Sequence, residues 1–188
     1  MDLLHTKIAD IDRPRESIVL LLGLGAIFSV GAAWSFELAG FVPCKLCLMQ
    51  RMPYYLAIPL AFMGWGVERI SGPAWLTRVV LLVLAGLFLW GGSVGVYQAG
   101  AEWGWWPGPA DCGAARGGTI PTAAGDLLGS LSKVKIVDCT KPQIRILGLS
   151  FAGLNVIASS GLILLAFAGM IAPAAPEPTP HGSSSVSQ

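Results

Sequence analysis

Four long apolar segments, at residues 17–34, 48–67, 75–97 and 146–171, limit what this chain can fold into. Each is close to the roughly 20 residues that an α-helix needs to cross the hydrocarbon core of a bilayer. Only 12% of the 188 residues are charged, whereas soluble domains carry about a quarter. The sequence therefore predicts that residues 17–171 form an all-α membrane protein, a bundle of four transmembrane helices.

The connections between these segments differ in length and alternate between the two sides of the bundle. Residues 35–47 and 98–145 form two outward-facing loops on one side, and the second of them is long. A short turn at residues 68–73 contains the turn sequence Ser-Gly-Pro. The two ends of the chain, residues 1–16 and 172–188, contain little to bury and are predicted to be disordered tails. Four spans place both tails on the same side.

The four cysteines lie in the two loops and form two pairs of unlike spacing. Cys44 and Cys47 belong to a CxxC motif, whose short spacer lets the sulfurs close a small disulfide ring and commonly lowers one thiol pKa. Cys112 and Cys139 lie far apart in the long loop. Because a thiolate is the species that attacks disulfides, this arrangement favours a membrane-embedded redox domain that performs thiol and disulfide chemistry.

Charge and cysteine chemistry together predict the orientation of the chain. Lys and Arg are similar in number on the two sides, but the N-terminal Lys7, Arg13 and Arg15 favour a cytoplasmic N-terminus. Disulfides persist in the periplasm and are rare in the cytosol. We therefore expect both tails in the cytoplasm and both cysteine loops on the periplasmic side of the lipid bilayer. Because the first apolar segment is longer than the core of a signal peptide and further spans follow it, we expect it to be retained.

Within the long loop, residues 126–137 place leucines and valines near helical spacing, with Lys133 and Lys135 off that stripe. This pattern predicts a short amphipathic helix, which either lies on the membrane surface or packs on the helix bundle. In both cases Cys139, which follows it, is held near the membrane.

Arg51 is a charged residue inside an apolar segment that is predicted to cross the membrane. It follows Cys47 by four residues, so both side chains lie on one face of a helix that begins near Cys47. A charge inside an apolar span is unfavourable and usually has a functional partner, although a long side chain can also extend to the head groups. We expect Arg51 to stabilise either the Cys47 thiolate or an oxygen of a redox cofactor.

The sequence PCKLCLMQR at residues 43–51, followed by a long loop with Cys112 and Cys139, resembles the disulfide bond formation protein B (DsbB) family. The lead-in WPGP at residues 106–109, before Cys112, is also similar to members of that family. The resemblance covers about residues 17–170 and includes the layout of four spans with two unequal loops.

This resemblance implies a quinone-dependent enzyme of the bacterial inner membrane that reoxidises a soluble, periplasmic, DsbA-like dithiol protein. Cys112 would form the mixed disulfide with that partner, and Cys139 would resolve it and then pair with Cys44. Cys47 would remain as a thiolate against the ring of ubiquinone or menaquinone, with Arg51 beside the quinone oxygen. These four cysteines would be the catalytic residues, and Cys47 and Arg51 the residues that contact the quinone.

The chain departs from the family at the histidine that accompanies the quinone, because His5 and His181 both lie in the tails. No flavin, haem or nucleotide motif suggests a different electron acceptor. A net charge of +1 gives no indication of nucleic-acid binding.

Three alternatives use the same cysteines differently. Four cysteines could bind structural zinc, although such sites usually combine two tight pairs. A thiol oxidoreductase of the vitamin K epoxide reductase type also has four spans and a CxxC motif, but carries that motif in a late span. Two disulfides could also serve as structural links alone, a reading that leaves Arg51 without a role.

Several other polar residues have simpler expected roles. Asn155, Ser159 and Ser160, in the fourth segment, are expected to support helix packing through hydrogen bonds. Glu37 and Glu102, near the outer ends of the first and third segments, are expected to be solvated loop charges.

Overall fold

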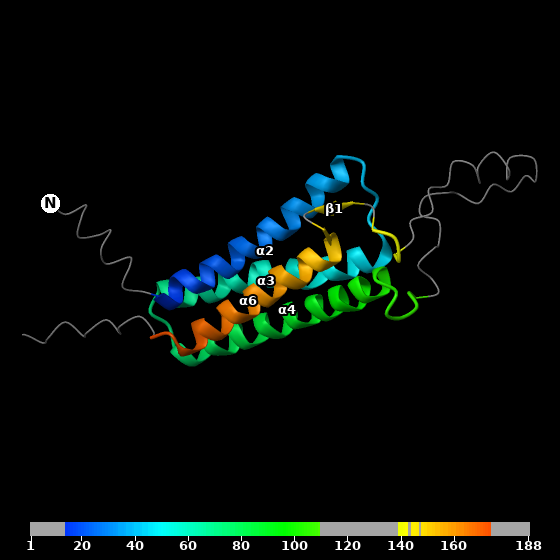
Figure 1. The fold of residues 1–188 in the computed structure, drawn as a ribbon. Coiled ribbons are helices and arrows are strands. Elements are labelled where there is room, and N and C mark those ends of the chain that lie inside the picture. The colour runs from blue at the N-terminus through cyan, green and yellow to red at the C-terminus, as the bar shows by residue number, and fades with distance from the viewer. Residues whose placement is uncertain (1–13, 110–138, 143, 147, 174–188) are drawn as a thin grey trace, which may run out of the picture.

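The computed structural model describes residues 14–109, 139–142, 144–146 and 148–173. In these ranges four long helices pack side by side as one bundle (Figure 1). The helices are α2 (Pro14–Leu38), α3 (Lys45–Arg69), α4 (Ala74–Glu102) and α6 (Phe151–Ile171). The predicted all-helical bundle is therefore confirmed for this part of the chain.

Three of the four helices, α2, α4 and α6, are long and apolar enough to cross a membrane. Helix α3 spans about 37 Å at 1.5 Å per residue, which is long enough for the hydrocarbon core. Its composition is less apolar, because it contains Arg51 and ends with Glu68 and Arg69. The crossing of α3 stays a prediction.

Helices α2, α3 and α4 extend further than the apolar segments that predict them. Helix α2 begins at Pro14, whose fixed φ suits the first helical position, and it continues to Leu38. Helix α4 reaches Glu102, well past the predicted end at residue 97. Polar residues at these ends continue the helices because their backbone hydrogen bonds are made within the helix, whatever the side chain.

One segment predicted as helix has another structure. The fourth apolar segment was expected to begin at residue 146, but β1 (Arg145–Ile146) and β2 (Leu149–Ser150) form a small antiparallel hairpin in front of α6. Gly148 adopts a φ of +83° between these strands, a conformation that glycine accepts without strain. Ser150 then caps α6, because its side chain accepts a hydrogen bond from the Gly153 N–H.

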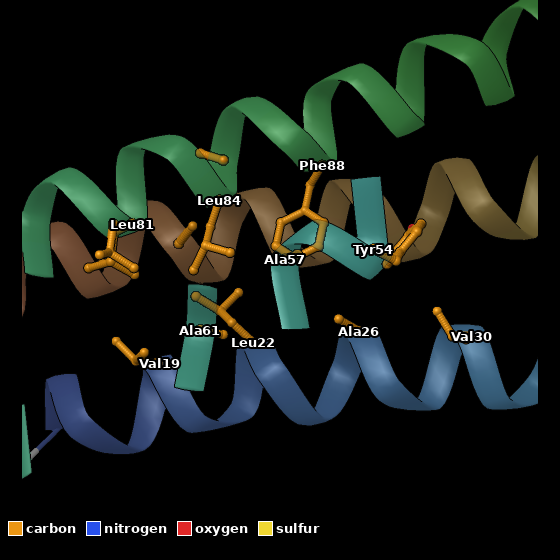
Figure 2. Packing of buried hydrophobic residues seen from close by; sticks show 13 residues of the cluster. Val19, Leu22, Ala26, Val30, Tyr54, Ala57, Ala61, Leu81, Leu84 and Phe88 are labelled. Atoms are coloured by element: carbon orange, nitrogen blue, oxygen red, sulfur yellow. The ribbon is translucent and has the colours of Figure 1, made fainter. Parts of the chain in front are cut away.

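The interior of the bundle is packed with aliphatic and aromatic side chains from all four helices (Figure 2). Leu22 of α2, Ala61 of α3, and Leu84 and Phe88 of α4 are almost completely buried there. Large apolar residues such as Phe28 are instead exposed on the outer surface, as expected where lipid surrounds a bundle. The figure labels ten members of this core: Val19, Leu22, Ala26, Val30, Tyr54, Ala57, Ala61, Leu81, Leu84 and Phe88.

A buried arginine joins three helices at the end of the bundle where the described chain begins and ends (Figure 1). Arg15 of α2 is 1% exposed and donates hydrogen bonds to the carbonyl oxygens of Gly169 and Ala172, at the end of α6. Its Nη1 also lies 3.7 Å from Oε1 of Glu68 in α3. The N-terminal end of α2 and the C-terminal end of α6 therefore lie together.

Residues 1–13, 110–138 and 174–188 lie outside the described part of the chain. The predicted amphipathic helix at residues 126–137 and most of both predicted tails are thus not tested. The prediction of a disordered tail was wrong for residues 14–16, because they form the first turn of α2 and include the buried Arg15. Cys112 also lies outside the described residues.

Candidate active site

The CxxC motif lies at the N-terminus of α3, at the end of the bundle opposite to Arg15. Cys44 is the N-cap residue, and its Sγ accepts a hydrogen bond of 3.3 Å from the Cys47 N–H. Pro43 precedes it and lacks an N–H, so the helix starts after the cap. Both cysteines are free thiols, with their Sγ atoms 2.9 Å apart and Cys44 donating to Cys47.

This contact makes the two thiols unequal. Cys44 and Cys47 both lie before the span predicted for residues 48–67, outside the membrane-crossing part of the helix. The hydrogen bond from the Cys44 thiol lowers the pKa of Cys47 to about 6, against the opposing effect of burial, and a hydrogen bond from Gln98 lowers it further. The same hydrogen bond, together with burial, raises the pKa of Cys44. At neutral pH, Cys47 is therefore the thiolate and Cys44 holds the shared proton.

Of the second cysteine pair, Cys139 lies within the described residues. This residue is disulfide-bonded and only 2% exposed. It packs with Cys44 and Leu46 in a small hydrophobic cluster that Cys47 borders. The fold thus brings one cysteine of the long loop against the CxxC motif, across nearly a hundred residues of sequence.

Arg51 lies one helical turn after Cys47 and turns toward α2. Its Nη1 donates a hydrogen bond of 2.7 Å to Oε2 of Glu37, and its Nη2 donates one of 3.3 Å to the Ala33 carbonyl oxygen. The Arg51 side chain is 13% exposed, so it does not extend freely toward head groups. Glu37 is exposed, as predicted, but it is not a loop charge, because α2 continues to Leu38 and places Glu37 in this ion pair.

A cavity of about 400 Å³ opens beside these residues and is walled by all four helices. Phe36, Phe41 and Phe151 form an aromatic cluster on its wall, in which the rings of Phe36 and Phe151 lie 4.6 Å apart. Polar side chains form the smaller part of its lining. They are Ser29, Glu37, Cys44, Cys47, Gln50, Arg51, Tyr54, Gln98, Glu102, Lys141 and Asn155.

Two buried glutamines connect α3 and α4 at this cavity, and the sequence analysis did not identify them. Gln50 Nε2 donates a hydrogen bond of 2.7 Å to Oε1 of Gln98, and both side chains are buried. Gln98 Nε2 in turn lies 3.5 Å from Cys47 Sγ and 3.2 Å from Oε1 of Glu102. The signal in the sequence was a neutral amide at the outer end of the second and of the third apolar segment.

Glu102 differs from its predicted role as a solvated loop charge. It is the last residue of α4, lines the cavity and accepts a hydrogen bond from Gln98. Its second oxygen, Oε2, is buried and has no hydrogen-bond partner among the described residues. The prediction failed because α4 continues past residue 97 and turns this side chain inward.

Deeper along the same wall, Tyr54 joins α3 to α6. Its hydroxyl lies 2.7 Å from Oδ1 of Asn155 and 2.9 Å from Oγ of Ser159. Asn155 Nδ2 donates to the carbonyl oxygen of Gly91 in α4, at 3.1 Å. The predicted packing role is confirmed for Asn155 and Ser159, whereas Ser160 donates a hydrogen bond within its own helix.

The described residues contain no group of three or more His, Cys, Asp or Glu side chains placed to hold a metal ion. Cys139 is in a disulfide, and a disulfide sulfur is not the thiolate that a structural zinc site requires. The described cysteines are thus two thiols in contact with each other and one disulfide sulfur.

Comparisons with known proteins agree with this arrangement. The family model described as "Disulfide bond formation protein DsbB" matches residues 15–169, which include the CxxC motif, Arg51 and Cys139. The "Uncharacterized protein RP370" of Rickettsia prowazekii (strain Madrid E) is 25% identical over 178 residues, covering 90% of this chain and 95% of the relative. No solved structure matches the chain significantly. Because the family model covers most of its length, the chain belongs to the disulfide bond formation protein DsbB family.

Proposed function

We propose that this protein is a thiol:quinone oxidoreductase that reoxidises a soluble, DsbA-like dithiol protein and passes two electrons to a membrane quinone. Membership of the family makes it a membrane oxidoreductase of disulfide formation. The partner, the acceptor and the electron path belong to the proposal. One observation carries it: Cys47 and Arg51 line the same largely apolar cavity, walled by all four helices.

The lining of the cavity fits a quinone head group. Its volume of about 400 Å³ lies in the range of small-molecule sites. Phe36 and Phe151 provide aromatic surface for a planar ring, and Arg51 provides a positive charge for a ring oxygen. A bound quinone, whether ubiquinone or menaquinone, would supply the capacity to accept two electrons and two protons.

The unequal thiols give the proposed relay a direction. In the proposed sequence the partner's thiolate attacks Cys112 and releases Cys139, which then attacks the oxidised Cys44–Cys47 disulfide. Attack at Cys44 is favoured, because Cys139 packs against Cys44 and because the leaving thiol with the lower pKa, Cys47, departs more readily. Cys47 is thereby left as the thiolate that faces the cavity.

This relay requires a defined orientation in the membrane. We place the end of the bundle with the CxxC motif toward the periplasm and the end with Arg15 toward the cytoplasm, in a bacterial inner membrane. Helix α3 would then cross the membrane together with α2, α4 and α6. Its charged residues would lie at its two ends and at the cavity. Both chain termini would lie in the cytoplasm.

The test is reconstitution of the full chain with a reduced DsbA-like protein and a water-soluble quinone, compared with four single Cys→Ser variants. The proposal expects quinone reduction by the wild-type protein and loss of transfer from the partner in each variant. Transfer at the wild-type rate in Cys112→Ser, or in Cys47→Ser, would contradict the proposed path. Metal analysis of the same preparation addresses the zinc alternative, which requires stoichiometric zinc.

A further inference from the structure

Formation of the Cys44–Cys47 disulfide releases a proton for which the cysteines provide no acceptor. Cys44 holds the proton that it shares with Cys47 across 2.9 Å. When the two sulfurs bond, this proton must leave a buried site, since Cys44 is only 5% exposed. A base that reaches the cavity is therefore needed.

Two carboxylates line the cavity, and their surroundings differ. Glu37 is neutralised by Arg51, at 2.7 Å, on the α2 side. Glu102 accepts a hydrogen bond from the neutral amide of Gln98 through one oxygen, while its other oxygen is buried without a hydrogen-bond partner among the described residues. An ionised carboxylate oxygen in that position is a ready proton acceptor.

The geometry also places Glu102 close to the reacting sulfurs. The same nitrogen, Gln98 Nε2, lies 3.2 Å from the Glu102 carboxylate and 3.5 Å from Cys47 Sγ. The carboxylate oxygen and the sulfur are thus separated by no more than these two distances together, which leaves room for at most about one bridging water. The charged and titratable groups around the cavity are Glu37, Cys44, Cys47, Arg51, Tyr54, Glu102 and Lys141.

We propose that Glu102 accepts the Cys44 proton during oxidation of the CxxC motif and delivers it to the quinone, and that Gln98 is the positioning residue that holds Glu102 beside Cys47. This inference rests on the proposed function. As the Cys44 and Cys47 sulfurs bond, two electrons pass to the quinone and the Cys44 proton passes to the Glu102 carboxylate. The Glu102 acid then gives that proton to a quinone oxygen. The second proton of the quinol comes from solvent, where Cys47 released its own proton on becoming a thiolate.

A Glu102→Gln variant separates this role from a structural one, because glutamine has the same shape and its carbonyl oxygen can still accept the hydrogen bond from Gln98. The experiment uses the full chain with Cys112→Ser and Cys139→Ser, so that only the CxxC thiols react. Disulfide formation is followed from pH 5 to 9 with a water-soluble quinone. Since positioned acids and bases contribute roughly 100-fold or more, we expect the Glu102→Gln rate to fall by about 100-fold, with Glu102→Asp retaining part of it.

A second readout needs no quinone. The negative charge of Glu102 raises the pKa of Cys47, so Glu102→Gln is expected to move the midpoint of Cys47 alkylation to lower pH. The matched control is Glu16→Gln, which removes a carboxylate paired with Arg69 at the opposite end of the bundle and is expected to change neither readout.

The outcomes are distinct. An unchanged rate and pH profile in Glu102→Gln, while the parent protein reduces quinone, overturns the role of Glu102 and leaves the proposed function intact. Absence of quinone reduction by the parent protein overturns both. If Glu102→Gln does not fold, Glu102→Ala is assayed with added formate: restored oxidation supports the inference, and no restoration by formate overturns it.

Discussion

Arg51 of α3 and Glu37 of α2 form an ion pair, with Nη1 and Oε2 separated by 2.7 Å, at the wall of the cavity that Cys47 also lines. The pair fixes a cation on the cavity wall, one helical turn after Cys47 in α3, and joins the two helices near their outer ends. Because Glu37 is 43% exposed, the pair is partly screened by solvent, and its main consequence is the position of the guanidinium.

Replacing Arg51 should weaken quinone binding more than thiol exchange. A hydrogen bond to a charged group contributes about 1.5–3 kcal/mol, so Arg51→Met should raise the KM for quinone by roughly tenfold to 100-fold. Steady-state kinetics with varied quinone concentration measures this change. The rate at which a reduced soluble dithiol reduces the Cys44–Cys47 disulfide should stay near its wild-type value, and an unchanged KM would exclude the contact between Arg51 and quinone.

The ionisation of Cys47 should be visible in its reactivity. In a Cys112→Ser, Cys139→Ser background, the alkylation rate of Cys47 should rise with pH through a midpoint near the pKa of about 6 and fall as acid protonates the thiolate. Cys44→Ala removes the hydrogen bond that contributes most to this lowered pKa, so the midpoint should move to higher pH. A midpoint that is unaffected by Cys44→Ala would show that the sulfur contact does not set the ionisation.

The buried pair of Gln50 and Gln98 should contribute to stability as a unit. Gln98→Leu leaves the Gln50 amide buried without its 2.7 Å partner, at a cost of about 1–3 kcal/mol. The double variant Gln50→Leu, Gln98→Leu removes both polar groups and should recover much of this loss. Thermal unfolding in detergent measures the difference, and additive losses in the double variant would contradict the pairing.

Arg15 should stabilise the bundle without affecting its chemistry. Arg15→Leu removes the hydrogen bonds to the end of α6 and the ion pair with Glu68, and breaking a buried ion pair costs about 3–5 kcal/mol. The double variant Arg15→Leu, Glu68→Leu should be less destabilised than Arg15→Leu alone. Unfolding curves test the stability, and the alkylation profile of Cys47 should be the same in all three proteins.

The bundle could be predicted because the lengths of the apolar segments report directly on membrane-crossing helices. The ends of those helices could not, since α4 continues to Glu102 through residues 98–102, which are less apolar than the segment before them. The hairpin before α6 was also missed, because Ile146 and Leu149 read as part of one apolar run. Its signal was Gly148, which takes up a positive φ.

Only part of the site could be predicted from the sequence, because some of its residues act through contacts between helices. Cys44, Cys47 and Arg51 drew attention because a thiol pair and a charge are unusual in such surroundings. Gln98 did not, and Glu102 was assigned to a solvated loop. Their importance lies in the contact of Gln98 with Cys47, which joins α4 to α3, and in the hydrogen bond from Gln98 to Glu102. The cavity itself is made by four helices and has no counterpart in any single stretch of sequence.

The most direct test of the account is a single turnover with the Cys112→Ser, Cys139→Ser protein, reduced and mixed with a water-soluble quinone, while quinone absorbance and free thiols are followed together. The account predicts that one quinone is reduced for each protein molecule as Cys44 and Cys47 form a disulfide, and that the additional change Cys47→Ser abolishes the reaction. Quinone reduction that persists without Cys47, or thiols that stay reduced in its presence, would contradict the claim that Cys47 passes electrons to a quinone in this cavity.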